Sequence, residues 1–239
     1  MRRILRTSVA ALTITLAAVG MPMAANAAPT PHKQHSFQYH PWPDASKSFK
    51  TKGVFDTPNQ DTITVQQGAT IRSGGGGTCS ITLIGDHTGY TAEHCSHGQW
   101  HRGSEIFDQS NHLIGRVAAM ARGLDAVKID LDSSVRVDGH WEKRDYNSLN
   151  VGEPVHVLGL GQQFNESRVA DQPLQPWPSA NSRETAALVS PLNSKPGTSG
   201  GAMVDRNNRV IGINVGYLGN STGKYGAYLP WNVVDSELH

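Results

Sequence analysis

The sequence has little that would suit a nucleic-acid-binding or membrane protein. Basic and acidic residues almost cancel, at 21 and 20, so no charge excess would attract a nucleic acid. After the first 27 residues no stretch is apolar enough to span a bilayer. Sustained helical periodicity is also almost absent. What is present, 25 glycines and 13 prolines in 239 residues, indicates a loop-rich β protein of one large domain or two small ones.

The N-terminus has the features of a secretory signal. Three arginines in the first six residues precede an apolar run over residues 9–19, and a small-residue Ala-Asn-Ala segment ends at Ala27. The alternative is a membrane anchor, but this run is too short to cross a bilayer core of about 30 Å. We therefore predict a signal peptide over residues 1–27, its removal after Ala27, and a soluble, secreted protein.

Residues 28–60 lack both strand and helix periodicity, and prolines there are interleaved with histidines, lysines and serines. We expect an extended N-terminal segment. The sequence leaves open whether it is a removed propeptide, a linker or an arm on the surface of the fold. Its histidines His32, His35 and His40 would also allow a metal site, but a solvated polar tail is the favoured interpretation.

Alternation of apolar and polar residues begins at Thr62 and recurs in short runs separated by turns. Residues 79–84 and 89–92 predict a hairpin that delivers His94 to a loop at a strand end. Many short strands with almost no helix favour a barrel or a sandwich. Further strands are expected at residues 62–65, 69–72, 104–107, 112–118, 126–131, 154–160, 185–190, 203–204, 210–215 and 225–228, and a short helix after residue 230.

A serine stands between glycines in residues 197–201, Gly-Thr-Ser-Gly-Gly. A serine hydroxyl needs a base to take its proton and N–H donors to stabilise the oxyanion that its attack creates. Glycine permits a positive φ, so the amides of Gly197 and Ser199 could point into one small space. The segment also fits the G-x-S-x-G elbow of α/β-hydrolases, but there the histidine follows the serine, and here only the terminal His239 does.

A base and an acid precede this serine. His94 lies in the segment Thr-Ala-Glu-His-Cys, and Asp125 begins the run Asp-Ala-Val-Lys-Ile. With residues 197–201, these segments in the order His, Asp, Ser resemble the motifs of the chymotrypsin-like (trypsin-fold) serine proteases, of the short secreted bacterial kind. The resemblance covers about residues 78–228.

The resemblance implies a catalytic triad of His94, Asp125 and Ser199, with an oxyanion hole formed by the amides of Gly197 and Ser199. It implies a secreted serine endopeptidase that forms an acyl-enzyme, needs no cofactor, takes protein or peptide substrates and is a monomer. A catalytically silent protease homologue that acts as a binding protein is the alternative.

Two other assignments of the polar residues stay open at this point. Asp130 and Asp132 are rival acids, although they fall near the solvated end of the expected strand. His94, His97 and His101 could converge on zinc if their segment were helical, but no Glu-x-x-His helix pattern supports this.

The resemblance further implies an all-β fold of two six-stranded antiparallel β-barrels, about residues 61–135 and 136–239, with the active site between them. The only two cysteines, Cys79 and Cys95, lie 16 positions apart, as in the disulfide that braces the family's histidine loop. Export favours their pairing, and free or zinc-bound thiols are the alternative.

The family's substrate site maps onto five further residues. The pocket floor is expected near Asn193, the substrate-binding strand through Asn214, Val215 and Gly216, and a pocket wall at Gly226. No acidic side chain falls at the floor, so a preference for Arg or Lys is not supported, and we expect cleavage after uncharged residues.

The sequence departs from the family at two positions beside the triad. Glu93 stands where the family usually has Ala, and Thr198 replaces the Asp that precedes the serine. In animal members that Asp pairs with the new N-terminal amine after zymogen cleavage. This chain therefore needs another way to hold its oxyanion loop, and Pro196 and the Thr198 hydroxyl are the candidates.

Overall fold

The structure is a computed structural model that describes residues 38–40, 62–72, 77–171, 174–176, 185–221 and 223–238. All of these belong to one compact unit, His35–His239. The predicted signal peptide and most of the predicted segment 28–60 lie outside the described residues. Within the described part, no helix has both the length and the apolar character needed to cross a membrane.

The first barrel is built from one antiparallel sheet in the order β4-β3-β7-β8-β9-β6-β5. Only Ile81 separates β4 from β5, so the two ends of the sheet are nearly one strand and the sheet closes on itself. Its interior is filled by isoleucines such as Ile71, Ile106 and Ile129, all fully buried. The strands are β3 (Thr70–Arg72), β4 (Thr78–Ser80), β5 (Thr82–Ile84), β6 (Thr88–Thr91), β7 (Glu105–Asp108), β8 (Leu113–Met120) and β9 (Val127–Leu131).

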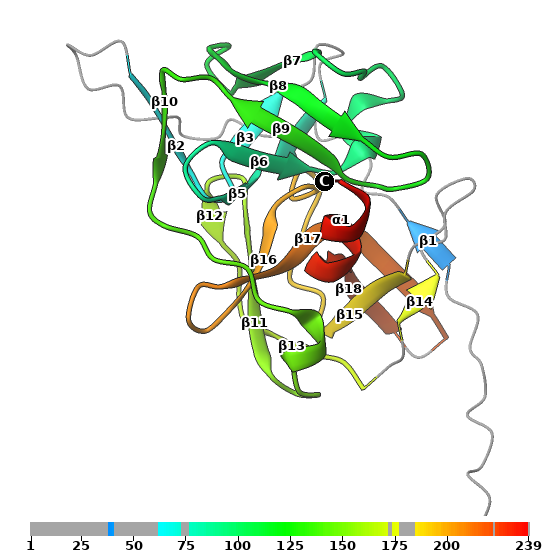
Figure 1. Ribbon diagram of the computed structural model, residues 1–239. Helices are drawn as coiled ribbons and strands as arrows, with labels where there is room; N and C mark the ends of the chain where they lie inside the picture. The colour runs from blue at the N-terminus through cyan, green and yellow to red at the C-terminus, as the bar shows by residue number, and fades with distance from the viewer. Residues whose placement is uncertain are drawn as a thin grey trace, which may run out of the picture. The chain divides into compact units, whose positions relative to one another are not determined.

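The second barrel is a closed ring of six strands, β17-β16-β11-β13-β15-β18, in which β18 pairs with both β15 and β17. Alternate residues point inward, among them Val155, Val157 and Met203. The strands are β11 (Pro154–Gly159), β13 (Ser167–Val169), β15 (Thr185–Ser190), β16 (Ala202–Asp205), β17 (Val210–Asn220) and β18 (Gly223–Pro230). Figure 1 shows this barrel beneath the first. The predicted two-barrel, all-β fold is confirmed.

Several elements were not predicted from the sequence. β1 (Gln38–His40) pairs antiparallel with β17, so these three residues of the N-terminal segment lie on the fold as an arm. β10 (Val135–Asp138), which follows the first barrel, pairs in parallel with β2 (Ile63–Gln66), the strand expected at residues 62–65. Two strands of two residues, β12 (Gln162–Gln163) and β14 (Gln175–Pro176), pair with β11 and β15.

The helix α1 (Trp231–Glu237) follows β18 of the second barrel and contacts the first barrel. The Trp231 ring meets the Tyr90 ring of β6 edge-on, with centroids 4.8 Å apart. Lys143, in the connection between the barrels, contacts the Asp235 carboxylate at 2.8 Å. The expected C-terminal helix is therefore present and packs against the first barrel.

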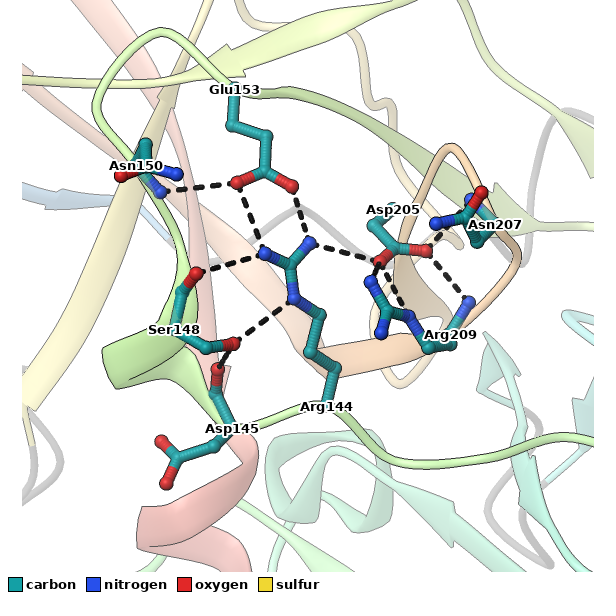
Figure 2. A network of polar contacts seen from close by, with 8 residues as sticks. All are labelled: Arg144, Asp145, Ser148, Asn150, Glu153, Asp205, Asn207 and Arg209. Atoms are coloured by element: carbon teal, nitrogen blue, oxygen red, sulfur yellow. Dashed lines mark hydrogen bonds and ion pairs between the residues drawn. The ribbon is translucent and has the colours of Figure 1, made fainter.

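An ion-pair network holds the connection between the barrels to the second barrel (Figure 2). The Arg144 guanidinium donates to the carboxylate of Glu153 and, at 2.9 Å, to that of Asp205. Arg209 also donates to Asp205, in the turn between β16 and β17. The hydrogen bond from Arg144 is the main reason that the pKa of Glu153 lies below its usual value. Asp205 is buried, and loss of Arg144 would leave Arg209 as the one guanidinium shown to pair with this carboxylate in the described part of the chain.

The predicted disulfide between Cys79 and Cys95 is present, with Cα atoms 6.2 Å apart. It joins β4 to the short 3₁₀ helix η2 (Glu93–Ser96), which carries His94. A crosslink stabilises a fold mainly by reducing the conformational freedom of the unfolded chain.

Replacing Cys79 and Cys95 together by Ala should lower the free energy of unfolding by about 3 kcal/mol, the value for a loop of this size. Urea denaturation of the oxidised protein and of the double variant measures the difference. A reductant should destabilise the wild type and leave the variant unaffected. Equal unfolding midpoints for the two proteins without reductant would contradict the prediction.

Candidate active site

His94 is held in place by its local structure. The chain leaves β6, bends at Ala92 and enters η2, which ends at His97 in the left-handed region, with φ 49°. Cys95, the next residue after His94, is tied to β4 by the disulfide. The His94 side chain is 22% exposed, so part of it stays open to solvent.

Asp125 lies in the connection between β8 and β9 and is 3% exposed. Its Oδ1 accepts a hydrogen bond from the backbone amide of His94 at 3.0 Å. Its Oδ2 lies 2.9 Å from Nδ1 of the same residue. The rival acids Asp130 and Asp132 are both exposed, and Asp132 accepts hydrogen bonds from Ser134. One carboxylate therefore orients both the backbone and the ring of His94.

Ser199 belongs to the second barrel and lies in the loop that precedes β16. Its Oγ lies 2.8 Å from Nε2 of His94. Gly197 before it has φ 91°. In the described part of the chain, the amides of Gly197 and Ser199 donate to no protein acceptor. The structure therefore brings His94, Asp125 and Ser199 together and leaves both amides available as donors.

The first barrel binds the backbone of residues 197–201, called the serine loop from here on. Ser80 donates from its amide to the Ser199 carbonyl at 2.7 Å and from its hydroxyl to the Gly197 carbonyl at 2.8 Å. Thr82 donates from its hydroxyl to the Gly200 carbonyl at 2.8 Å. The sequence motifs point to neither residue, although polar side chains at alternate positions of an otherwise apolar strand are a signal of buried hydrogen bonding.

The pKa of His94 lies above its usual value, the outcome of opposing causes. Burial alone would lower it by disfavouring the charged ring. The charge of Asp125, its hydrogen bond to the ring and the charge of Glu93 outweigh burial and raise it. A proton taken up by His94 is thus stabilised, as a general base requires.

The five residues expected in the substrate site lie in different surroundings. The Asn193 amide donates to the Glu166 carbonyl at 2.7 Å, and the Asn214 side chain is buried. Val215 is buried in the core, and Gly216 follows it in β17. A Cβ added at Gly226 would press on Val189. Substrate contact by these residues stays a prediction.

In the described ranges, no three His, Cys, Asp or Glu side chains are grouped so as to hold a metal ion. His94, His97 and His101 therefore form no such group, since η2 is a single short turn. His101 instead contacts the Ser104 hydroxyl at 3.1 Å through Nδ1.

No protein-family model matches the sequence, and no curated protein matches it. Solved structures do. Chymotrypsin from Cellulomonas bogoriensis is 21% identical, with a TM-score of 0.53 over 74% of this chain and 99% of that one. Nocardiopsis protease is 18% identical, with a TM-score of 0.54 over 74% and 100%. Thermobifida fusca protease A is 18% identical, with a TM-score of 0.53 over 74% and 98%.

The chain has the chymotrypsin fold. In this chymotrypsin fold, His94 and Asp125 come from the first barrel and Ser199 from the second, so the candidate site lies where the two barrels meet. At these identities the likeness establishes the fold, and the chemistry is argued from the side chains themselves.

The close packing of the serine loop against the first barrel can be tested by substitution of Gly200. It has φ 81°, and an added Cβ would overlap the Thr91 hydroxyl and the Ser80 carbonyl. Gly103 has φ 89°, but a Cβ there would meet open space. We expect Gly103→Ala to cost about 1 kcal/mol through backbone strain alone, and Gly200→Ala to cost about 2 kcal/mol more through overpacking. Urea denaturation measures both, and equal costs would show that the loop can move away.

Proposed function

We propose that this protein is a secreted serine endopeptidase that hydrolyses peptide bonds through Ser199, His94 and Asp125. The observation that carries the proposal is a chain of two hydrogen bonds. Asp125 lies 2.9 Å from Nδ1 of His94, and Nε2 of the same ring lies 2.8 Å from the Ser199 hydroxyl. A base within hydrogen-bond reach of a serine, itself oriented by a carboxylate, is the arrangement that activates this nucleophile.

The mechanism follows from this geometry. Asp125 accepts a hydrogen bond from the Nδ1–H of His94 and so fixes the tautomer whose Nε2 lone pair faces the Ser199 hydroxyl. As Oγ attacks the peptide carbonyl, Nε2 takes its proton, and the amides of Gly197 and Ser199 stabilise the oxyanion. Nε2 then gives the proton to the leaving amine, an acyl-enzyme forms, and water activated by His94 hydrolyses it. No step requires a cofactor.

Several features support the proposed setting and substrate. The sequence pattern of residues 1–27 supports export, and the Cys79–Cys95 disulfide suits an oxidising compartment. We propose that the substrate is a protein or peptide lying extended along β17 at Asn214–Gly216, where strand addition would supply backbone hydrogen bonds. We also propose that the protein acts as a monomer and cleaves after uncharged residues.

Labelling by a serine-directed phosphonate tests the nucleophile. Wild type should gain the mass of the phosphonyl group, and Ser199→Ala should not, with peptide hydrolysis falling by roughly 10⁴-fold or more. Ser194→Ala is the matched control, because that buried hydroxyl has no hydrogen-bond partner in the described part of the chain, and it should still be labelled. Circular dichroism confirms folding. An unlabelled but folded wild type would favour the silent binding homologue.

The raised pKa of His94 gives a pH prediction. Only neutral His94 can accept the serine proton, so kcat/KM should rise with pH through a midpoint above 6.5, the ordinary value. Glu93→Gln removes one of the charges that raise this pKa, so its midpoint should shift to lower pH with the triad intact. The measurement is kcat/KM against pH on a neutral peptide substrate. A midpoint that stays unchanged in Glu93→Gln would count against the assignment of the limb to His94.

A further inference from the structure

The serine loop is fastened to the second barrel by one buried amide. Asn214 of β17 is 0% exposed. Its Nδ2 lies 3.0 Å from the Thr198 carbonyl and 3.1 Å from the Thr198 hydroxyl, and it donates to both. The Thr198 hydroxyl in turn donates to the Lys195 carbonyl at 2.7 Å. Both hydrogen bonds that the Asn214 amide donates therefore go to the residue before Ser199.

This contact acts on an oxyanion donor through the peptide plane. The Thr198 carbonyl and the Ser199 amide belong to one peptide unit, which is planar and trans, so the C=O and N–H point in opposite directions. Asn214 and, at 2.9 Å, the Gly201 amide both donate to this carbonyl oxygen. Fixing that oxygen fixes the direction of the Ser199 N–H, which donates to no protein group in the described ranges.

The remaining acceptor of Asn214 shows what the side chain is suited to. Its Oδ1 is buried and has no hydrogen-bond partner in the described part of the chain. An unpaired buried acceptor is unfavourable, so packing alone would be better served by an apolar side chain of the same shape, such as Leu. The two donated hydrogen bonds to Thr198 are what an amide provides here and Leu does not.

We propose that Asn214 is a positioning residue that, through Thr198, aims the Ser199 amide into the oxyanion hole. This role rests on the proposed endopeptidase function. It also explains the departure from the Asp of the animal proteases, since neutral hydrogen bonds from β17 hold the loop where those proteins use a carboxylate paired with a new N-terminal amine. The loop is thus in its working conformation without an ion pair.

The test separates a misdirected Ser199 amide from a loss of protein stability. Asn214→Leu should lower kcat by about tenfold to a hundredfold, below the loss for a whole oxyanion donor. KM should change less than twofold, because the oxyanion exists only in the transition state. The acid limb of the pH profile should not move, since His94 and Asp125 are untouched. Thr198→Val should also lower kcat, and Thr198→Ser, which keeps the hydroxyl, should restore it.

Gln67→Ala is the matched control. Gln67 is a buried amide of the first barrel whose two hydrogen bonds go to Leu83, so its loss should lower stability and leave kcat unchanged. If Asn214→Leu fails to fold, the Thr198→Val and Thr198→Ser pair decides in its place.

The outcomes distinguish the two proposals. A wild type that no phosphonate labels overturns the endopeptidase function itself. A labelled wild type with Asn214→Leu labelled equally fast overturns only the role of Asn214. A fall in kcat that Gln67→Ala reproduces at equal loss of stability overturns that role as well.

Discussion

The arrangement of the site depends on the hydrogen bonds that the first barrel makes to the carbonyls of the serine loop. The base and the acid belong to the first barrel and the nucleophile to the second, so nothing in either barrel alone fixes their separation. Ser80 and Thr82 bind three carbonyls of residues 197–200 at 2.7–2.8 Å, and all the groups involved are buried. Buried backbone groups require partners, so any shift of one barrel would leave carbonyls and hydroxyls unpaired.

The same requirement explains why the loop is rich in glycine. The backbone of Gly200 reaches the Thr91 hydroxyl and the Ser80 carbonyl so closely that a Cβ does not fit. Its φ of 81° is also one that other residues rarely adopt. Close approach and positive φ act together here. The glycines that first indicate a turn in the sequence are therefore also the residues that let two barrels share one hydrogen-bond network.

Local sequence patterns predicted much of the molecule, because motifs and alternation are local. The segments around His94, Asp125 and Ser199, the Cys79–Cys95 pair and most barrel strands could be found in this way. The supports of the loop could not, since Ser80 and Gly197 lie 117 positions apart and only folding makes them partners. Likewise, nothing in residues 38–40 indicates the β17 edge with which they pair. The motif comparison marks Thr198 as a departure, but it predicts for its partner Asn214 only a place in the substrate strand.

Charge is distributed unevenly across the site, and this has a consequence for its chemistry. The groups that hold the serine loop, namely Ser80, Thr82, Thr198 and Asn214, are neutral and keep their hydrogen bonds at any pH at which the protein is folded. The ionisable groups lie around the imidazole, where Asp125 and Glu93 raise the pKa of His94. A change of pH through the pKa of His94 therefore acts on proton transfer and leaves the oxyanion loop in place. A loop held by a carboxylate and an amine would instead lose its support as the amine deprotonates.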